Sequence, residues 1–145
     1  MGWVRVDEIY KGNITNRMLI DEAKTKPWWK NISDGVADPS RSDLIQEWGE
    51  EGVTLYRAEN DVDKGIEHVK NVLRPVLGNP KAFFNRNYCR ATIREFKSYR
   101  IKNGRIVKED DHAMDEIRYF LMKECKEDGL IGGSVDFDVT EYTRR

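Results

Sequence analysis

Short apolar runs alternate with segments of helical periodicity along this chain, and this alternation constrains the fold more than any single motif does. The strand-like runs cover three segments: 35–37, 53–58 and 81–84. Apolar residues recur at helical spacing in four others: 15–24, 41–48, 60–73 and 90–99. A further strand is predicted over 3–10, and Asn103-Gly104 predicts a hairpin over 99–107. Strands that alternate with helices are typical of an α/β domain, here with a mixed sheet flanked by helices.

Length and composition indicate one soluble domain. The chain has 145 residues, of which 39% are hydrophobic and 35% charged. The net charge of −1 combines 25 basic with 26 acidic residues, so only local clustering could indicate a nucleic-acid partner. Two cysteines, Cys89 and Cys125, are too few for a disulfide framework and suit a reducing compartment. No signal peptide and no run of about 18 apolar residues is present, which predicts a cytoplasmic protein without a membrane partner.

The segment 108–125 combines an amphipathic helix with an acidic start. Its apolar side is predicted from helical spacing: Met114, Ile117, Phe120 and Leu121. Its first turn carries four polar residues: Asp110, Asp111, His112 and Asp115. Acids here can simply complement the helix macrodipole and cap free N–H groups. Alternatively, Asp111 and Asp115 lie one turn apart and form, with His112, the corner of a divalent-metal site. Both interpretations stand on the local sequence.

Asp38 is a second candidate, because it ends the predicted strand 35–37. Functional side chains are often presented at the carboxyl ends of strands in α/β proteins. The other interpretation is structural, since Asp38-Pro39-Ser40 also suits an Asx-turn that leads into a helix. The local sequence favours neither interpretation over the other.

Taken together, the carboxylates favour metal chemistry over other mechanisms. No phosphate-binding glycine loop and no nucleophile motif occurs. Carboxylates from separate elements are the ligands that Mg²⁺ or Mn²⁺ requires, and two such ions can hydrolyse a phosphodiester in line. The segment 86–108 is basic and could hold a nucleic-acid backbone. Its cations are Arg86, Arg90, Arg94, Lys97, Arg100, Lys102, Arg105 and Lys108. The interleaved aromatic residues Tyr88, Phe96 and Tyr99 are predicted to be core.

Three stretches carry a family resemblance: VADPS (Val36–Ser40), GVTLYRAENDVDKGI (Gly52–Ile66) and CRATIREFKSYRIKNGRIVKEDDHAMDEIRYFLM (Cys89–Met122). In this order and spacing they resemble the C-terminal nuclease domain of the terminase large subunit of tailed phages and prophages, over residues 3–125. The resemblance implies an RNase H-like fold and a Mg²⁺- or Mn²⁺-dependent endonuclease that cuts concatemeric viral DNA. The implied partners are double-stranded DNA, the terminase ATPase domain, the small subunit and the portal.

The resemblance also assigns roles to residues. Asp38 matches the second catalytic aspartate, Asp115 is favoured as the acid of the C-terminal helix with Asp111 close behind, and His112 is their neighbour. The strand bearing the family's first catalytic aspartate would precede Trp3. This implies an N-terminally truncated nuclease domain (1–128) with a C-terminal tail (129–145). DNA-binding candidates are Arg90, Arg94, Lys97, Arg105 and Lys108. The alternative is a catalytically incomplete DNA-binding or motor-docking module of the same family.

Overall fold

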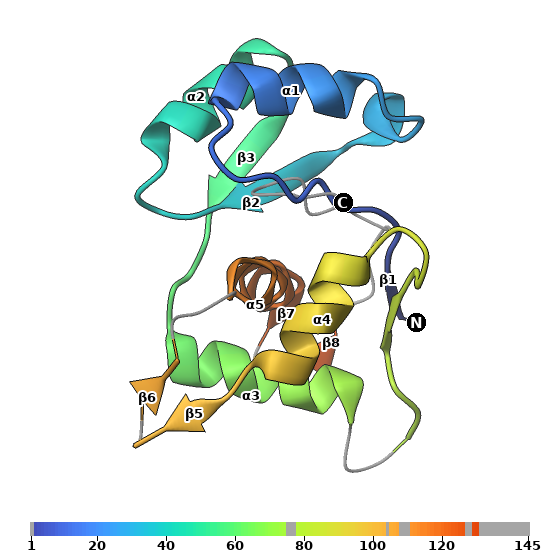
Figure 1. The fold of residues 1–145 in the computed structure, drawn as a ribbon, viewed down its shortest axis with the longest axis vertical. Coiled ribbons are helices and arrows are strands. Elements are labelled where there is room, and N and C mark those ends of the chain that lie inside the picture. The colour runs from blue at the N-terminus through green and yellow to red at the C-terminus, as the bar shows by residue number, and fades with distance from the viewer. Residues whose placement is uncertain (1, 75–77, 104, 108–110, 127–128, 131–145) are drawn as a thin grey trace.

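Residues 2–74, 78–103, 105–107, 111–126 and 129–130 are described by the computed structural model, and they form a mixed α/β fold with five α-helices (Figure 1). The helices are α1 (Asn16–Lys24), α2 (Ser42–Glu50), α3 (Val62–Leu73), α4 (Arg90–Ser98) and α5 (His112–Glu124), with a 3₁₀ turn at Trp29–Asn31. The strands are β1 (Trp3–Arg5), β2 (Asp34–Ala37), β3 (Thr54–Arg57), β4 (Ala82–Phe84), β5 (Ile101–Lys102), β6 (Arg105–Ile106), β7 (Cys125–Lys126) and β8 (Gly129–Leu130). The element types predicted from periodicity are confirmed. The proposed tail from 131 onward lies outside the described residues.

The parallel strands form two separate pairs in the described part of the chain, where the sequence predicts one mixed sheet. β2 pairs with β3 from Asp34↔Thr54 to Ala37↔Arg57, and β1 pairs with β4. The hairpins β5–β6 and β7–β8 are antiparallel. The first strand is also shorter than predicted, because the chain leaves β4 after Arg5 and buries Glu8 and Ile9 elsewhere.

Two helices begin at local caps. The Thr15 hydroxyl accepts a hydrogen bond from the Met18 N–H at 3.1 Å and begins α1. The Asp61 carboxylate accepts one from the Lys64 N–H at 3.0 Å and begins α3. Each cap satisfies a backbone donor that the helix itself leaves without a partner.

The starts of α4 and α5 are instead capped by carboxylates from distant segments. Glu8 accepts hydrogen bonds from the backbone N–H groups of Ala91 (2.6 Å) and Thr92 (2.9 Å) on α4. Glu95, itself on α4, accepts them from Ala113 (2.8 Å) and Met114 (3.2 Å) on α5. The start of α5 is therefore fixed through α4 by a chain of buried carboxylates.

Two apolar clusters stabilise the fold. The helices α1 and α2 and the strands β2 and β3 lie in the upper part of Figure 1, and α3 and α5 lie below them. The first joins α1 and α2 to the β2–β3 pair: Ile9, Leu19, Ile20, Ala23, Ala37, Leu44, Trp48, Val53 and Leu55. The second lies among α3, α5 and the β1–β4 pair: Trp3, Val72, Ala113, Met114, Ile117 and Leu121. Between them, Val36, Ala58 and Tyr119 form a junction cluster. This junction is where β2 and β3 end against α5.

Helix α5 runs through the centre of the molecule. The predicted apolar side is confirmed, since Met114, Ile117 and Leu121 pack in the second cluster. Burial extends beyond the apolar side, because Glu116 and Arg118 are also buried. α3, α4 and β2 pack around α5 from different sides, so Glu116 and Arg118 face protein.

Candidate functional site

Asp38 follows β2 directly, at the junction of the two clusters. Its Oδ1 accepts hydrogen bonds from the Ser40 N–H (2.8 Å) and hydroxyl (2.6 Å), and its Oδ2 accepts one from the Tyr119 hydroxyl (3.1 Å). Partial burial acts to raise the pKa of Asp38, but these hydrogen bonds and the charge of Arg41 lower it below the ordinary 3.8. The Asx-type turn is therefore confirmed, and the other carboxylate oxygen contacts α5. A functional role for Asp38 stays a prediction.

Asp115 lies in the first turn of α5. Its Oδ1 accepts a hydrogen bond at 3.0 Å from Arg118, whose other terminal nitrogen donates to the Asn60 side chain at 2.9 Å. Asn60 follows β3, the strand that pairs with β2. Asp115 is thus tied to the same end of the parallel pair at which Asp38 lies.

Tyr119 lies close enough to Asp38 and Asp115 for both charges to act on it. Burial raises the pKa of its hydroxyl, and the charges of both aspartates raise it further. α5 runs antiparallel to β2, since Tyr119 contacts Asp38 and, one turn later, Lys123 pairs with Asp34 at 2.9 Å. The first turn of α5 therefore lies beyond the carboxyl end of β2, as a site built from both elements requires.

Asp111 and His112 lie at the start of α5. Asp111 is buried before α5, and its carbonyl accepts the Asp115 N–H at 2.9 Å. His112 is exposed, acts electrostatically on Glu95, and lines a cleft of about 270 Å³. The other residues around this cleft are Tyr10, Lys11, Gly12, Asn13, Ile14, Thr15, Asn16, Leu19, Arg41 and Leu44. His112 thus faces the 10–16 loop. The predicted metal corner of Asp111, His112 and Asp115 stays a prediction.

The described residues at the junction offer few ligands to a metal ion. Within the described residues, no group of three or more histidine, cysteine, aspartate or glutamate side chains is arranged to hold a metal ion. Asp38 and Asp115 offer carboxylate oxygens, the donors that Mg²⁺ and Mn²⁺ prefer. Nucleophilic catalysis by Cys89 is disfavoured, because burial raises the pKa of this thiol to about 11.

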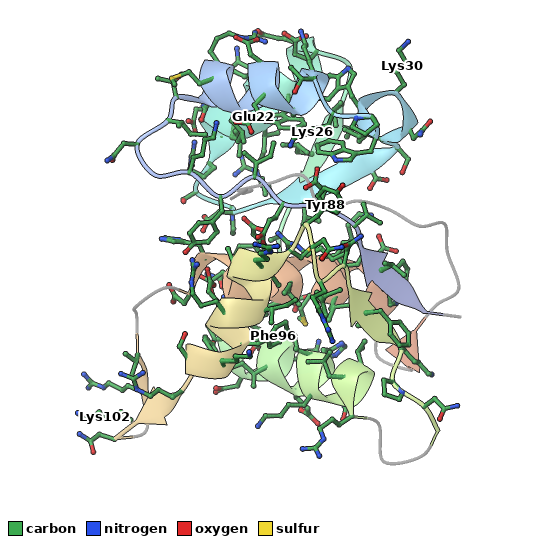
Figure 2. The ribbon with its side chains drawn as sticks, turned by 45° about the vertical axis from the view of Figure 1, so that its right-hand side comes forward. Glu22, Lys26, Lys30, Tyr88, Phe96 and Lys102 are labelled. Carbon is green, nitrogen blue, oxygen red and sulfur yellow. The ribbon has the colours of Figure 1, made fainter. Side chains whose placement is uncertain are left out.

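Helix α4 carries a basic stripe. Arg90, Arg94 and Lys97 recur at helical spacing and are all exposed, with the Arg94 guanidinium 5.4 Å from the centre of the Tyr10 ring. Arg105 is exposed on the β5–β6 hairpin, and Lys102 of this hairpin points away from the helices (Figure 2). Lys108 lies outside the described residues. These side chains are exposed, and their role in DNA binding stays a prediction.

Of the aromatic residues in the basic segment, two are core and one is not. Phe96 packs edge-on against Phe84 with ring centres 5.1 Å apart, and Tyr99 contacts the second cluster. Tyr88 is 62% exposed, so its assignment to the core is wrong. Its backbone N–H is held by the Asn85 side chain in a turn before α4, which turns the ring outward.

Sequence reasoning missed Tyr119, Arg118 and Asn60 as members of the site. The spacing of Asp115, Arg118 and Tyr119 would have placed them on one side of a helix. Nothing local connects them to Asp38 or to Asn60, because those contacts depend on how α5 crosses the strand ends.

The fold and site together define a mixed α/β protein with two carboxylates at the carboxyl end of a parallel strand pair. Among the described helices, none has the length and apolar character that a membrane span requires. Comparisons with protein-family models, with curated proteins and with solved structures found no match to this chain.

Proposed function

We propose that this chain is the Mg²⁺- or Mn²⁺-dependent endonuclease domain of a phage terminase large subunit, with an RNase H-like core that cuts concatemeric double-stranded DNA during genome packaging. One observation carries the proposal. Asp38 and Asp115, which the family resemblance marks as catalytic, come from distant parts of the sequence. Asp38 nevertheless accepts the hydroxyl hydrogen of Tyr119, and Asp115 precedes Tyr119 by one turn of α5. Carboxylates gathered from separate elements are more typical of a metal site than of a helix cap.

A neighbour on α5 would fix the orientation of each aspartate for metal binding. Tyr119 donates its hydroxyl hydrogen to Asp38, and Arg118 donates to Asp115. With its pKa lowered, Asp38 is ionised at neutral pH and can accept a cation. A bound divalent ion would polarise a phosphodiester and lower the pKa of a bound water. Two carboxylates also match the usual protein contribution to Mg²⁺, which takes its other ligands from water and substrate phosphates.

Plasmid nicking in Mn²⁺ tests the proposal. We expect Asp38→Asn and Asp115→Asn to lower the nicking rate by about 100-fold or more, as removal of a ligand to an essential ion would. Asp63→Asn is the matched control, because Asp63 is an exposed aspartate in the first turn of α3 and lies outside the site. Equal nicking by all four proteins, or nicking that persists in EDTA, would contradict the proposal.

The basic stripe of α4 supports the second candidate, a DNA-binding module of the same family that does not cleave. In this case the logarithm of the DNA affinity should fall linearly with the logarithm of salt concentration, whatever metal is present. Replacing Arg90, Arg94 or Lys97 by alanine should reduce this slope by about 0.9 for each phosphate that is no longer neutralised. Lys30→Ala is the control, since Lys30 lies far from α4 (Figure 2). Salt-dependent binding without nicking would favour this candidate.

A further inference from the structure

Arg118 is a buried cation held between two side chains. Only 3% of its surface is exposed, and its terminal nitrogens donate to Asp115 and Asn60. Within the described residues, its Nε–H is buried with no hydrogen-bond partner. Burying a guanidinium with one donor unsatisfied opposes folding, so stability alone does not explain this residue.

Helix α3 makes room for Arg118 at Gly65. A Cβ atom added to Gly65 would lie 2.1 Å from the Arg118 Cγ and 2.5 Å from its Cδ, far inside any real contact. The backbone of Gly65 is helical, so the conformation does not require glycine there. Glycine inside a helix is unfavourable relative to alanine. Close contact with the aliphatic part of the Arg118 side chain therefore explains why a glycine occupies this position.

The presence of Arg118 changes the charge that the site offers to a metal ion. Asp38 and Asp115 contribute two negative charges, Arg118 removes one, and Arg41 adds a positive field at Asp38. A divalent ion on Asp115 would share that carboxylate with a guanidinium in a partly buried setting, where like charges repel strongly. A substrate phosphodiester supplies the negative charge that the free site lacks.

We propose that Arg118 is a resident cation that couples metal binding to DNA binding: it occupies Asp115 in the free protein and disfavours the divalent ion until a phosphodiester arrives. Gly65 leaves the space beside α3 that the Arg118 side chain occupies. This inference rests on the proposed metal-dependent function and adds a regulatory property to the same site. By linkage, the metal ion and the DNA must strengthen one another's binding by the same factor.

Mn²⁺ affinity, measured by water-proton relaxation on ice with and without a short DNA duplex, tests the coupling. Arg118→Met keeps an unbranched stem beside Gly65 and removes the charge, so we expect about tenfold tighter Mn²⁺ binding without DNA and a smaller gain when DNA is added. Arg118→Lys keeps the charge and should stay within about threefold of the wild type.

The outcomes separate this inference from the proposed function. If Asp115→Asn abolishes Mn²⁺ binding while Arg118→Met binds no more tightly than the wild type, the resident-cation role is wrong and the metal site stands. If the wild type binds no Mn²⁺ even with DNA, the proposed function fails and this inference fails with it.

A double-mutant cycle in thermal unfolding tests the role of Gly65 independently of any activity. Gly65→Ala should lower the melting temperature in the wild type but have little further effect in an Arg118→Ala background, where Cγ and Cδ are gone. Gly49→Ala is the matched control, because an added Cβ on this α2 glycine meets nothing within 4 Å. Equal effects of Gly65→Ala in both backgrounds would overturn the assignment.

Discussion

Asp38 and Glu95 fix the two sides of the candidate site, and their pKa values shift in opposite directions. Both carboxylates accept backbone N–H hydrogen bonds: Asp38 from Ser40, and Glu95 from Ala113 and Met114. Asp38 is partly exposed, so hydrogen bonds outweigh burial and its pKa falls. Glu95 is fully buried, so burial outweighs its hydrogen bonds and its pKa rises. Hydrogen bonding alone does not decide the sign of a shift, because desolvation competes with it.

The two carboxylates also differ in where their partners come from. Ser40 is two residues from Asp38, whereas the N–H groups held by Glu95 are 18 and 19 positions away. The turn that holds Asp38 is therefore local, although the Asp38 Oδ2 also accepts a hydrogen bond from the distant Tyr119. The α5 side depends on tertiary packing, and mutations there should have the larger structural effects.

Glu95→Ala should be the most damaging single change considered. It leaves two buried N–H groups at the start of α5 without an acceptor, at about 1–3 kcal/mol for each unsatisfied group. We expect the free energy of unfolding to fall by roughly 3 kcal/mol in urea titrations followed by circular dichroism. Glu95→Gln retains a carbonyl acceptor and should be much milder. Wild-type stability in Glu95→Ala would mean that α5 does not depend on this cap.

Thr15→Ala removes a local cap and should have a smaller effect. The Thr15 hydroxyl holds one N–H at the exposed start of α1, where water can replace it. We expect a decrease of about 1 kcal/mol in the same urea titration. A decrease as large as that of Glu95→Ala would contradict the distinction between local and remote caps.

Tyr119→Phe tests the contact that joins the two sides. Removing the hydroxyl deletes its hydrogen bond to Asp38 while keeping the ring in the junction cluster. We expect a decrease of about 1 kcal/mol in the free energy of unfolding. Tyr56→Phe is the control, since Tyr56 is 52% exposed and should change stability by less than about 0.5 kcal/mol. Equal effects of the two changes would argue against the Asp38 contact.

The pH dependence of stability should separate Asp38 from Glu95 by sign. The pKa of Asp38 is lowered from 3.8, so its stabilisation is present above that pH and is lost as the pH falls through the folded-state pKa. The pKa of Glu95 is raised from 4.5, so its contribution is favourable below that pH and is lost as the pH rises through the folded-state pKa.

Urea titrations across pH would measure these signs. Asp38→Asn should reduce the loss of stability in acid. The free energy of unfolding of Glu95→Gln should increase relative to that of the wild type as the pH rises above 4.5 toward neutrality, because the amide carries no charge that must be buried. If the contributions of Asp38 and Glu95 to the free energy of unfolding changed with pH in the same direction, burial would not distinguish the two carboxylates.

Much of the local structure was predictable because it depends on near neighbours. Thr15 and Asp61 cap helices whose starts lie beside them, and Pro39 and Ser40 follow Asp38 in the turn that holds it. The apolar side of α5 was also predictable from spacing. Its buried polar residues were not, since helical spacing does not reveal that α3, α4 and β2 surround this helix.

The sequence by itself determined which segments become helices or strands, where α1 and α3 begin, and that Asp38 ends a strand. Only the tertiary structure decided that β1 pairs with β4 and does not join the β2–β3 pair. It also decided that Glu8 and Glu95 cap helices at distant positions in the sequence, and that Arg118 contacts Gly65 on its way to Asp115. The physical reason is the distance along the sequence over which each interaction acts. Caps, turns and periodicity act over a few residues, whereas burial of charge and contact between helices depend on which distant segments meet.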